Sequence, residues 1–221
     1  MKKRYTGKNL VFFFDFDNTI TTMDVLDDML VRFSRDDRWQ ALEEKWKKGD
    51  IGSRACLKGQ VEGIRITKNQ LDKYLLTIRI DPYFKKLLDF LRYNKVRAMI
   101  VSDNFDYILD RILKNNGIEG MEAYSNKLKI LEDRLKPVFP YSNGSCGECA
   151  NCKKTTLLKN INKGDVSAYV GDGLSDLCGS QEADIVFAKD FLKTYYKNKK
   201  LPHVPIKGLK DIYEYLEEKA S

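Results

Sequence analysis

Short continuous apolar runs alternate along the chain with longer stretches in which apolar residues recur at helical spacing. Runs at residues 10–14, 96–102, 166–170 and 185–188 have the length and composition of buried strands. Helical spacing predicts helices at residues 83–93, 105–116, 153–162, 175–181, 189–196 and 209–218. Such alternation favours an α/β fold, with a parallel sheet covered by helices on both faces.

Residues 23–78 differ from this pattern, because helical spacing continues there without a convincing strand. One apolar stripe runs through residues 25–33 and another through Trp39, Leu42 and Trp46, and we expect the second stripe to form the interior of a helical unit. Asp81 and Pro82 then restart the alternating pattern, since proline favours the first turn of a helix. The chain therefore divides into residues 1–21 with 81–221, and an inserted helical unit of residues 22–80.

Residues 121–140 contain three short β-like runs, at 122–125, 128–131 and 134–139. We expect them to include a hairpin. Pro137 and Pro140 place it at a sheet edge, because proline cannot donate to a ladder of hydrogen bonds. A loop at residues 141–152 follows.

The first apolar run ends abruptly in two carboxylates, Asp15 and Asp17. In an extended chain these side chains share a face, where they repel each other unless a cation lies between them. Mg²⁺ prefers such oxygen ligands and binds through one or two carboxylates together with phosphate oxygens. The pair therefore suggests metal-assisted phosphoryl chemistry, with a solvated turn at the end of a strand as the alternative.

Further polar residues occur where later strands end or helices begin. Ser102 ends the second run, a lysine, Lys153 or Lys154, opens a helix, and Asp172 and Asp176 follow the third run. Each alone is explained by a cap, a solvated charge or a turn. Open parallel sheets, however, gather the carboxyl ends of their strands at one crevice. We therefore expect these residues to share a site with the opening acids.

The composition supports a packed globular protein. Of its 221 residues 43% are hydrophobic and 11% aromatic, enough for a core despite 32% charged residues. No apolar run approaches the roughly 18 residues of a membrane span, and no signal-peptide pattern opens the chain, so we expect a cytoplasmic protein without a membrane partner. The net charge of +7 is scattered, which favours a solvated surface that attracts phosphate esters over a nucleic-acid site. The sequence indicates no oligomeric state.

Three cysteines, Cys146, Cys149 and Cys152, have the close spacing of a zinc or redox site. A structural zinc site usually takes four ligands, and no fourth is evident because Cys178 and His203 are distant in sequence. Bound zinc, a local disulfide and unmodified thiols therefore remain as alternatives.

In their order along the chain, these residues resemble the four motifs of the haloacid dehalogenase-like hydrolases: Asp-x-Asp-x-Thr, a strand-terminal Ser or Thr, a Lys, and Gly-Asp-x-x-x-Asp. The match extends over residues 9–190. The resemblance implies a Rossmann-like core and an all-helical cap, residues 22–80, that closes over the substrate. The helical insert and the spacing of Asp172 and Asp176 are similar to the phosphoserine-phosphatase branch.

Two narrower groups within this superfamily are also similar. The cysteine loop that leads into Lys153 resembles the phosphocholine/phosphoethanolamine phosphatases and the methionine-salvage 2-hydroxy-3-keto-5-methylthiopentenyl-phosphate phosphatases, and residues 187–205 resemble the second group most. Asp103 and Asn104 depart from the Gly-Gly that the salvage and phosphoserine enzymes typically carry. Asp103 instead matches the Ser-Asp of the phosphocholine group, so the motifs do not assign a substrate.

The resemblance implies a role for each motif residue. Asp15 would attack phosphorus and form an aspartyl-phosphate, while Asp17 would protonate the leaving alkoxide and then take a proton from water. Mg²⁺ would be held by Asp15, Asp172, Asp176 and Asp17, the last through its backbone carbonyl. The phosphate-binding residues would be Asn18, Thr19, Ser102, Asp103 and Lys153. Lys153 is preferred to Lys154 because it directly follows the cysteine.

Substrate specificity is expected to come from the cap. Asp24 occupies a position where phosphoserine phosphatases place an acid for the substrate ammonium, although it suits the N-cap of the following helix equally well. Arg54 would meet a substrate carboxylate or oxygen, or lie in solvent.

The sequence therefore predicts a Mg²⁺-dependent phosphomonoesterase that hydrolyses a small-metabolite phosphate ester. A phosphotransferase or phosphomutase of the same superfamily is one alternative. A non-enzymatic, zinc-bearing, nucleic-acid-binding protein is another, but it leaves the ordered acids unexplained.

Overall fold

A seven-stranded sheet organises residues 10–142 and 147–220, the part of the chain that this computed structural model describes. The strands are β1 (Leu10–Phe14), β2 (Arg97–Phe105), β3 (Glu122–Leu131), β4 (Arg134–Val138), β5 (Val166–Gly171), β6 (Ile185–Ala188) and β7 (Val204–Pro205). Their order across the sheet is β4-β3-β2-β1-β5-β6-β7. Every neighbouring pair is parallel except β3 and β4, which form the expected hairpin at one edge.

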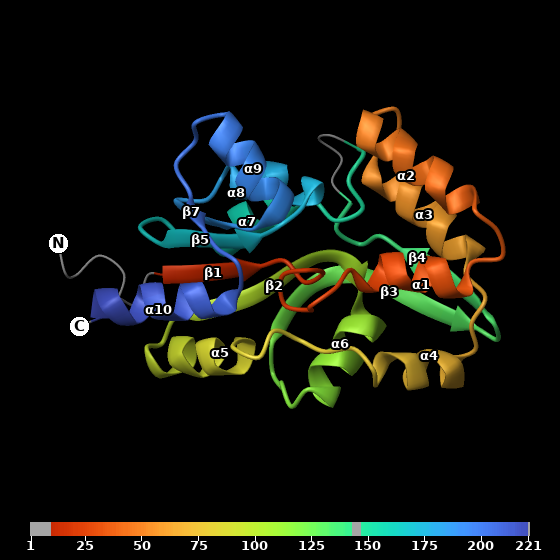
Figure 1. Ribbon diagram of the computed structural model, residues 1–221, viewed down its shortest axis with the longest axis horizontal. Helices are drawn as coiled ribbons and strands as arrows, with labels where there is room; N and C mark the ends of the chain where they lie inside the picture. The colour runs from red at the N-terminus through yellow and green to blue at the C-terminus, as the bar shows by residue number, and fades with distance from the viewer. Residues whose placement is uncertain (1–9, 143–146, 221) are drawn as a thin grey trace.

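Helices cover both faces of the sheet (Figure 1). They are α5 (Phe84–Tyr93), α6 (Asp106–Asn115) and α10 (Leu209–Ala220) on one face, and α7 (Lys153–Asn160), α8 (Leu177–Ser180) and α9 (Asp190–Asn198) on the other. A single 3₁₀ turn, η1 (Leu174–Asp176), leads into α8. This arrangement confirms the predicted Rossmann-like α/β core.

The central strand β1 is apolar throughout because both of its faces are buried. Phe12 and Phe14 pack into the cluster beneath α5, α6 and α10, whereas Val11 and Phe13 pack against Leu157 of α7 on the opposite face. β1 therefore delivers the residue that follows it to a rigid position at the middle of the sheet edge.

Four helices make up the inserted segment: α1 (Val25–Phe33), α2 (Arg38–Lys48), α3 (Ser53–Gly63) and α4 (Lys68–Leu75). The two ends of this segment lie side by side where it joins the core. Thr21 and Ile80 form an isolated antiparallel bridge there, and the Asp81 N–H donates to the carbonyl of Ile20 at 2.7 Å. These contacts fit the expected boundary at residues 22–80, although a separate cap domain remains a prediction.

The α2–α3 pair projects from the rest of the segment (Figure 1). A bridge between Ser34 and Ile64 joins its two ends, and a second bridge joins Arg65 to Arg134 of β4. The hairpin of β3 and β4 thus supports the inserted helices, a contact that the sequence did not indicate. In α2, all of which is described, no side chain is fully buried, but Trp39 is partly buried and packs against the main hydrophobic cluster, as expected of an interior position.

The sequence located most elements within a few residues. The β-like runs at 122–125 and 128–131 proved to be one strand, β3, and the two-residue β7 was missed. Within the described ranges, no helix combines the length and the apolar character that crossing a membrane requires.

Asp81 ties the returning chain to the core. Its Oδ1 accepts a hydrogen bond from the N–H of Tyr83 at 2.8 Å, and its Oδ2 accepts one from the N–H of Leu209, the first residue of α10, at 3.0 Å. The carboxylate therefore caps two helices that are distant in sequence.

We expect Asp81→Ala to lower the free energy of unfolding by about 1–3 kcal/mol, because both backbone donors lose their acceptor. Equilibrium unfolding in urea measures the change. Asp89→Ala is the matched control, since the ion pairs of Asp89 with Lys85 and Arg92 are exposed and their loss costs at most about 0.5 kcal/mol. Equal effects of the two substitutions would contradict this role of Asp81.

Candidate active site

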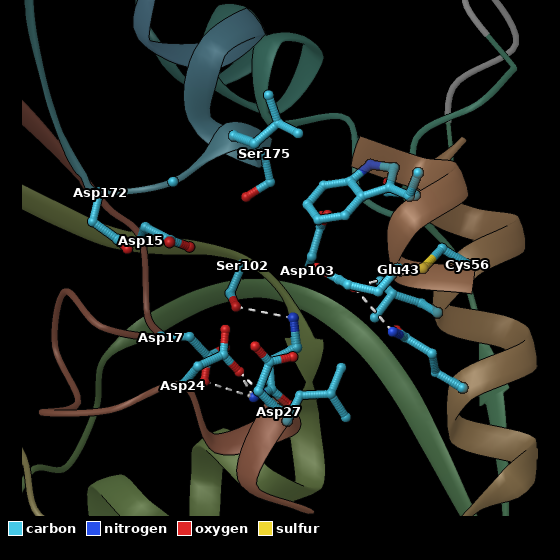
Figure 2. Close-up of a pocket in the computed structure, with 18 of the residues that line it drawn as sticks. Asp15, Asp17, Asp24, Asp27, Glu43, Cys56, Ser102, Asp103, Asp172 and Ser175 are labelled. Carbon is cyan, nitrogen blue, oxygen red and sulfur yellow. Dashed lines mark hydrogen bonds between the residues drawn. The ribbon is translucent and has the colours of Figure 1, made fainter. Parts of the chain in front are cut away.

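A cavity of about 530 Å³ lies where β1, β2 and β5 end, and the predicted site residues gather around it. Asp15, Asp17, Ser102, Lys153 and Asp172 all line it. In Figure 2, Asp15 and Asp172 lie on one side of this pocket, and the helices α2 and α3 bound the opposite side. The carboxyl ends of the parallel strands therefore form the crevice that the fold class predicts.

The loop after β1 brings the two acids to the pocket. Asp15 is 6% exposed, and its backbone N–H continues the pairing with β5 by donating to Val170 O at 2.9 Å. The chain then turns through Asn18, whose φ of 52° lies in the left-handed region that asparagine adopts more readily than most residues. Lys189 Nζ donates to the carbonyl of Asn18 at 2.6 Å and holds the turn.

Lys153, the first residue of α7, supplies the positive charge of the site. Its Nζ lies 2.6 Å from Asp15 Oδ1 and 2.7 Å from Asp176 Oδ1, and the residue is 2% exposed. Burial alone would lower the pKa of Lys153, but these carboxylates outweigh it and hold the pKa well above its usual value. Lys154 instead is exposed and pairs with Glu182. Of the two candidate lysines, the structure places only Lys153 in the pocket.

Asp176 orders the loop that follows β5. Its Oδ2 accepts hydrogen bonds from the backbone N–H groups of Asp172 at 3.0 Å and Gly173 at 2.9 Å. Its Oδ1 accepts from the hydroxyl of Tyr169 at 2.7 Å as well as from Lys153. With both oxygens engaged in this way, Asp176 serves to position the loop, whereas Asp172 faces the cavity.

The acids fit a divalent metal ion. Asp15, Asp172 and Asp176 form the one cluster among the described residues whose acidic, Cys or His ligand atoms lie close enough for an ion, within 4.8 Å of one another. Burial, followed by repulsion from Asp176, raises the pKa of Asp15 well above its usual value and that of Asp172 to about 7. The ammonium of Lys153 therefore does not fully neutralise the negative charge of these three acids. Oxygen donors with excess negative charge are what Mg²⁺ requires.

Asp17 is held from two directions. The N–H of Val25, the first residue of α1, donates to Asp17 Oδ1 at 2.9 Å, and Asn104 Nδ2 lies 3.1 and 2.9 Å from Oδ1 and Oδ2. Burial raises the pKa of Asp17 well above its usual value, and the neighbouring carboxylate of Asp24 adds to this effect. A carboxyl group that acts as a general acid needs a raised pKa of this kind.

Ser102 and Asp103 occupy different positions in the pocket wall. Ser102 is 1% exposed, and its Oγ accepts a hydrogen bond from the N–H of Asn104 at 3.0 Å. Asp103 Oδ1 accepts from the N–H of Asn151 at 3.2 Å, and burial raises the pKa of Asp103 to about 6. Because a carboxylate repels phosphate, anchoring the loop before α7 explains Asp103 better than the expected phosphate contact does.

The wall that faces the acids combines carboxylates with apolar side chains from the inserted helices. Figure 2 shows Glu43 and Cys56 on the α2–α3 side, with Asp24 and Asp27 below. The lining residues from this segment include Asp24, Leu26, Asp27, Glu43, Trp46 and Leu57. Trp46 thus borders the cavity, which corrects the expectation that it belongs to a helical interior.

The two predicted specificity residues have different surroundings. Asp24 is the N-cap of α1, with Oδ1 accepting from the N–H of Asp27 at 2.8 Å, and it also lines the pocket. Arg54 is exposed and lies outside the pocket lining. Its guanidinium donates to the carbonyl of Gly147 at 2.5 Å and its backbone N–H to that of Glu148 at 3.0 Å. The structure therefore gives Arg54 a contact with the cysteine loop, and a contact between Arg54 and substrate stays a prediction.

The cysteine motif is only partly visible, because Cys146 lies outside the described residues. Cys152 is buried, with Sγ 3.1 Å from Thr155 Oγ1, and Cys149 is half-buried. Neither belongs to the metal-ion cluster identified within the described ranges. Bound zinc, a disulfide and unmodified thiols therefore remain predictions for this motif.

Sequence reasoning missed the polar side chains that support the site from behind. Asn104 holds Asp17, Tyr169 holds Asp176, and Asn151 Nδ2 donates to the carbonyl of Ser102 at 2.9 Å. The departure from Gly-Gly at position 104 could have indicated that Asn104 has a role in the site. Tyr169 gave no such indication, because a tyrosine within an apolar strand is typical of a hydrophobic core.

The fold and this ordered set of residues are similar to those of haloacid dehalogenase-like phosphatases of the phosphoserine-phosphatase branch. The chain belongs to the family described as "Putative Phosphatase", whose pattern matches residues 10–203. Membership of an enzyme family sets aside the alternative of a non-enzymatic nucleic-acid-binding protein.

Relatives and solved structures agree with this assignment. The chain is 26% identical over 219 residues to a 2-hydroxy-3-keto-5-methylthiopentenyl-1-phosphate phosphatase of Geobacillus thermodenitrificans, covering 95% of this chain and 96% of the relative. The same-named enzyme of Brevibacillus brevis is 25% identical, with 96% and 97% covered. A substrate-bound phosphoserine phosphatase shares the fold with a TM-score of 0.68 at 20% identity, covering 93% of this chain and 97% of that chain.

We expect Lys153→Met to lower phosphatase activity by about 100-fold or more and the free energy of unfolding by about 3–5 kcal/mol. Among the described residues, Lys153 is the only ammonium that pairs with the buried carboxylates of Asp15 and Asp176, and the substitution removes it. Hydrolysis of p-nitrophenyl phosphate and unfolding in urea at pH 7 measure the two effects. Lys154→Met is the matched control and should change unfolding by less than about 1 kcal/mol. A larger loss of activity in Lys154→Met would refute the assignment.

Proposed function

We propose that this protein is a Mg²⁺-dependent phosphomonoesterase that hydrolyses a small phosphate ester through an aspartyl-phosphate at Asp15. The observation that carries the proposal is the position of Asp15, which is buried at the end of β1 between the ammonium of Lys153 and the carboxylate of Asp172. A second acid, Asp17, lines the same cavity two residues later.

The chain's own groups divide the work of the reaction. The carboxylate of Asp15 attacks phosphorus and needs no deprotonation to do so. Lys153 Nζ and the Ser102 hydroxyl donate to the phosphoryl oxygens, where negative charge spreads in the transition state. Asp17 gives a proton to the departing alkoxide and later takes one from the hydrolytic water.

The proposed Mg²⁺ ligands are Asp15, Asp172 and the backbone carbonyl of Asp17, with Asp176 keeping the loop of Asp172 in place. When bound, the ion supplies countercharge for the phosphoryl oxygens. The raised pKa values of Asp15 and Asp172 support this choice, because a nearby cation favours the charged carboxylates and so opposes the burial and repulsion that raise those values.

The pocket fits a small substrate under a cap of residues 22–80. Its volume of about 530 Å³ lies in the range of sites for small molecules. By their names, the relatives act on a methylthiopentenyl phosphate and the structural neighbours on phosphoserine. Among the described residues, the wall of Asp24, Asp27 and Glu43 has one cation, Lys47, which pairs with Glu43 at 3.1 Å. The carboxylates of this wall therefore outnumber its ammonium and disfavour a leaving group that carries a carboxylate.

At pH 8, above the pKa of Asp27, which burial raises to about 7, we expect a kcat/KM for phosphoethanolamine at least about tenfold above that for phosphoserine. Phosphoserine differs from phosphoethanolamine only by a carboxylate, and like charges in a pocket repel. Release of inorganic phosphate measures both rates. Asp27→Asn, which removes one carboxylate from the wall, should lower the ratio of the kcat/KM for phosphoethanolamine to that for phosphoserine. A preference for phosphoserine in the unmodified protein would show that the acidic wall does not govern selection.

The reaction itself is tested with p-nitrophenyl phosphate. We expect hydrolysis that requires Mg²⁺, stops when the ion is chelated, and falls by about 10⁴-fold or more in Asp15→Asn, which lacks the nucleophile. Circular dichroism checks that the variant is folded. Rapid hydrolysis by the folded Asp15→Asn protein, or undiminished hydrolysis after chelation, would overturn the proposal.

A further inference from the structure

Asn104 stands out among the residues to which the proposed reaction gives no role. It is 2% exposed, near the end of β2, and its amide nitrogen donates to the carboxylate of Asp17, at 3.1 Å from Oδ1 and 2.9 Å from Oδ2. A buried asparagine carries an unfavourable cost of desolvation that such hydrogen bonds offset. The amide of Asn104 makes these hydrogen bonds to Asp17, the residue to which we assign proton transfer.

The orientation of the Asn104 amide follows from its second contact. The backbone N–H of Phe105 donates to Asn104 Oδ1 at 2.7 Å, so the oxygen end of the amide is engaged by a donor. A reversed amide would set its oxygen against the carboxylate of Asp17 and its NH₂ group against an N–H. The surroundings therefore allow one orientation, in which the donor end faces Asp17.

The backbone of Asn104 also orients the phosphate-binding serine. Its N–H donates to Ser102 Oγ at 3.0 Å, which engages a lone pair of the hydroxyl and leaves the hydroxyl hydrogen to be donated elsewhere. Ser102 lines the cavity, so a phosphoryl oxygen there can accept that hydrogen. One residue thus serves both the phosphate-binding and the proton-transferring side of the pocket.

The two oxygens of Asp17 are not equivalent. Oδ1 accepts from the N–H of Val25 and from Asn104, whereas among the described residues Oδ2 accepts from Asn104 alone. Oδ1 is therefore the better site for negative charge. Oδ2 is the better site for the transferable proton, because fewer donors compete with it.

We propose that Asn104 is a positioning residue that holds the carboxyl of Asp17 with Oδ2 toward the leaving-group oxygen. The proposal rests on the proposed phosphatase reaction. As the bond from phosphorus to the ester oxygen breaks and the bond from phosphorus to Asp15 forms, the proton moves from Oδ2 to the departing alkoxide. Water then attacks phosphorus, displaces the carboxylate of Asp15 and returns a proton to Oδ2, so that alcohol and phosphate leave and both carboxyl groups are restored.

The test compares two esters of similar size whose leaving groups differ in basicity. p-Nitrophenolate leaves readily without a proton, whereas phenolate benefits from one. We expect Asn104→Ala to lower kcat/KM for phenyl phosphate about tenfold more than for p-nitrophenyl phosphate, because the substitution misplaces the acid and leaves the nucleophile in position. kcat/KM is the relevant constant because it reports formation of the phospho-enzyme and not its hydrolysis.

Further variants separate positioning from a structural effect. Asn104→Asp keeps the volume but replaces the donor with an acceptor, and should show the same selective loss. In an Asp17→Asn background, Asn104→Ala should cause no further selective loss, since residues that act as a unit are not additive. Asn126→Ala is the matched control, because Asn126 is equally buried but donates to the carbonyl of Asp103, and it should leave the ratio of the two esters unchanged.

Each outcome decides the question. Equal losses for the two esters, or no loss, in the folded Asn104 variants overturn the positioning role while leaving the phosphatase reaction standing. Absence of Mg²⁺-dependent hydrolysis of both esters by the unmodified protein overturns the reaction itself. A selective loss that disappears in the Asp17→Asn background supports the proposal.

Discussion

The site depends on one buried ammonium that faces three buried carboxylates. Lys153 contacts Asp15 and Asp176, yet burial and mutual repulsion still raise the pKa of Asp15 and Asp172. Such a cluster destabilises a fold unless its surroundings hold it firmly and further charge compensates it. Here β1 and β5 pair in parallel at the centre of the sheet, and both carry acids at their ends. The rigidity of the core therefore keeps the acids in place for the proposed cation and phosphate ester.

The inserted helices contribute directly to the geometry of the acids. The N–H of Val25 opens α1 and also binds Asp17, while Asp24 caps the same helix and lines the pocket. A displacement of α1 would therefore change the contacts of the acid and the shape of the pocket together. In the proposed reaction, α1 therefore both contacts the substrate and orients the proton donor, Asp17.

Much of the fold was predictable because its signals are local. Continuous apolar runs indicate strands buried on both faces, and acids after such runs must meet at the sheet edge. The supporting polar network was not predictable, because the partner of Asn104 or Tyr169 is set by tertiary structure. Helical spacing likewise located the apolar face that contains Trp46, but not that this face borders a cavity. Helical spacing also does not decide which of two adjacent lysines points inward from α7. The preference for Lys153 came from the resemblance, and it agrees with the position of Lys153 in the pocket.

The central claim, that Asp15 carries the phosphoryl group, can be tested by trapping. The protein is quenched during steady turnover and treated with borohydride, which reduces an acyl phosphate to an alcohol and so converts a phosphorylated aspartate to homoserine. Mass spectrometry of the peptides then identifies the modified position. If Asp15 carries the phosphoryl group, homoserine appears at residue 15. Reduction at another acid, or an unmodified Asp15 under conditions of full turnover, would contradict it.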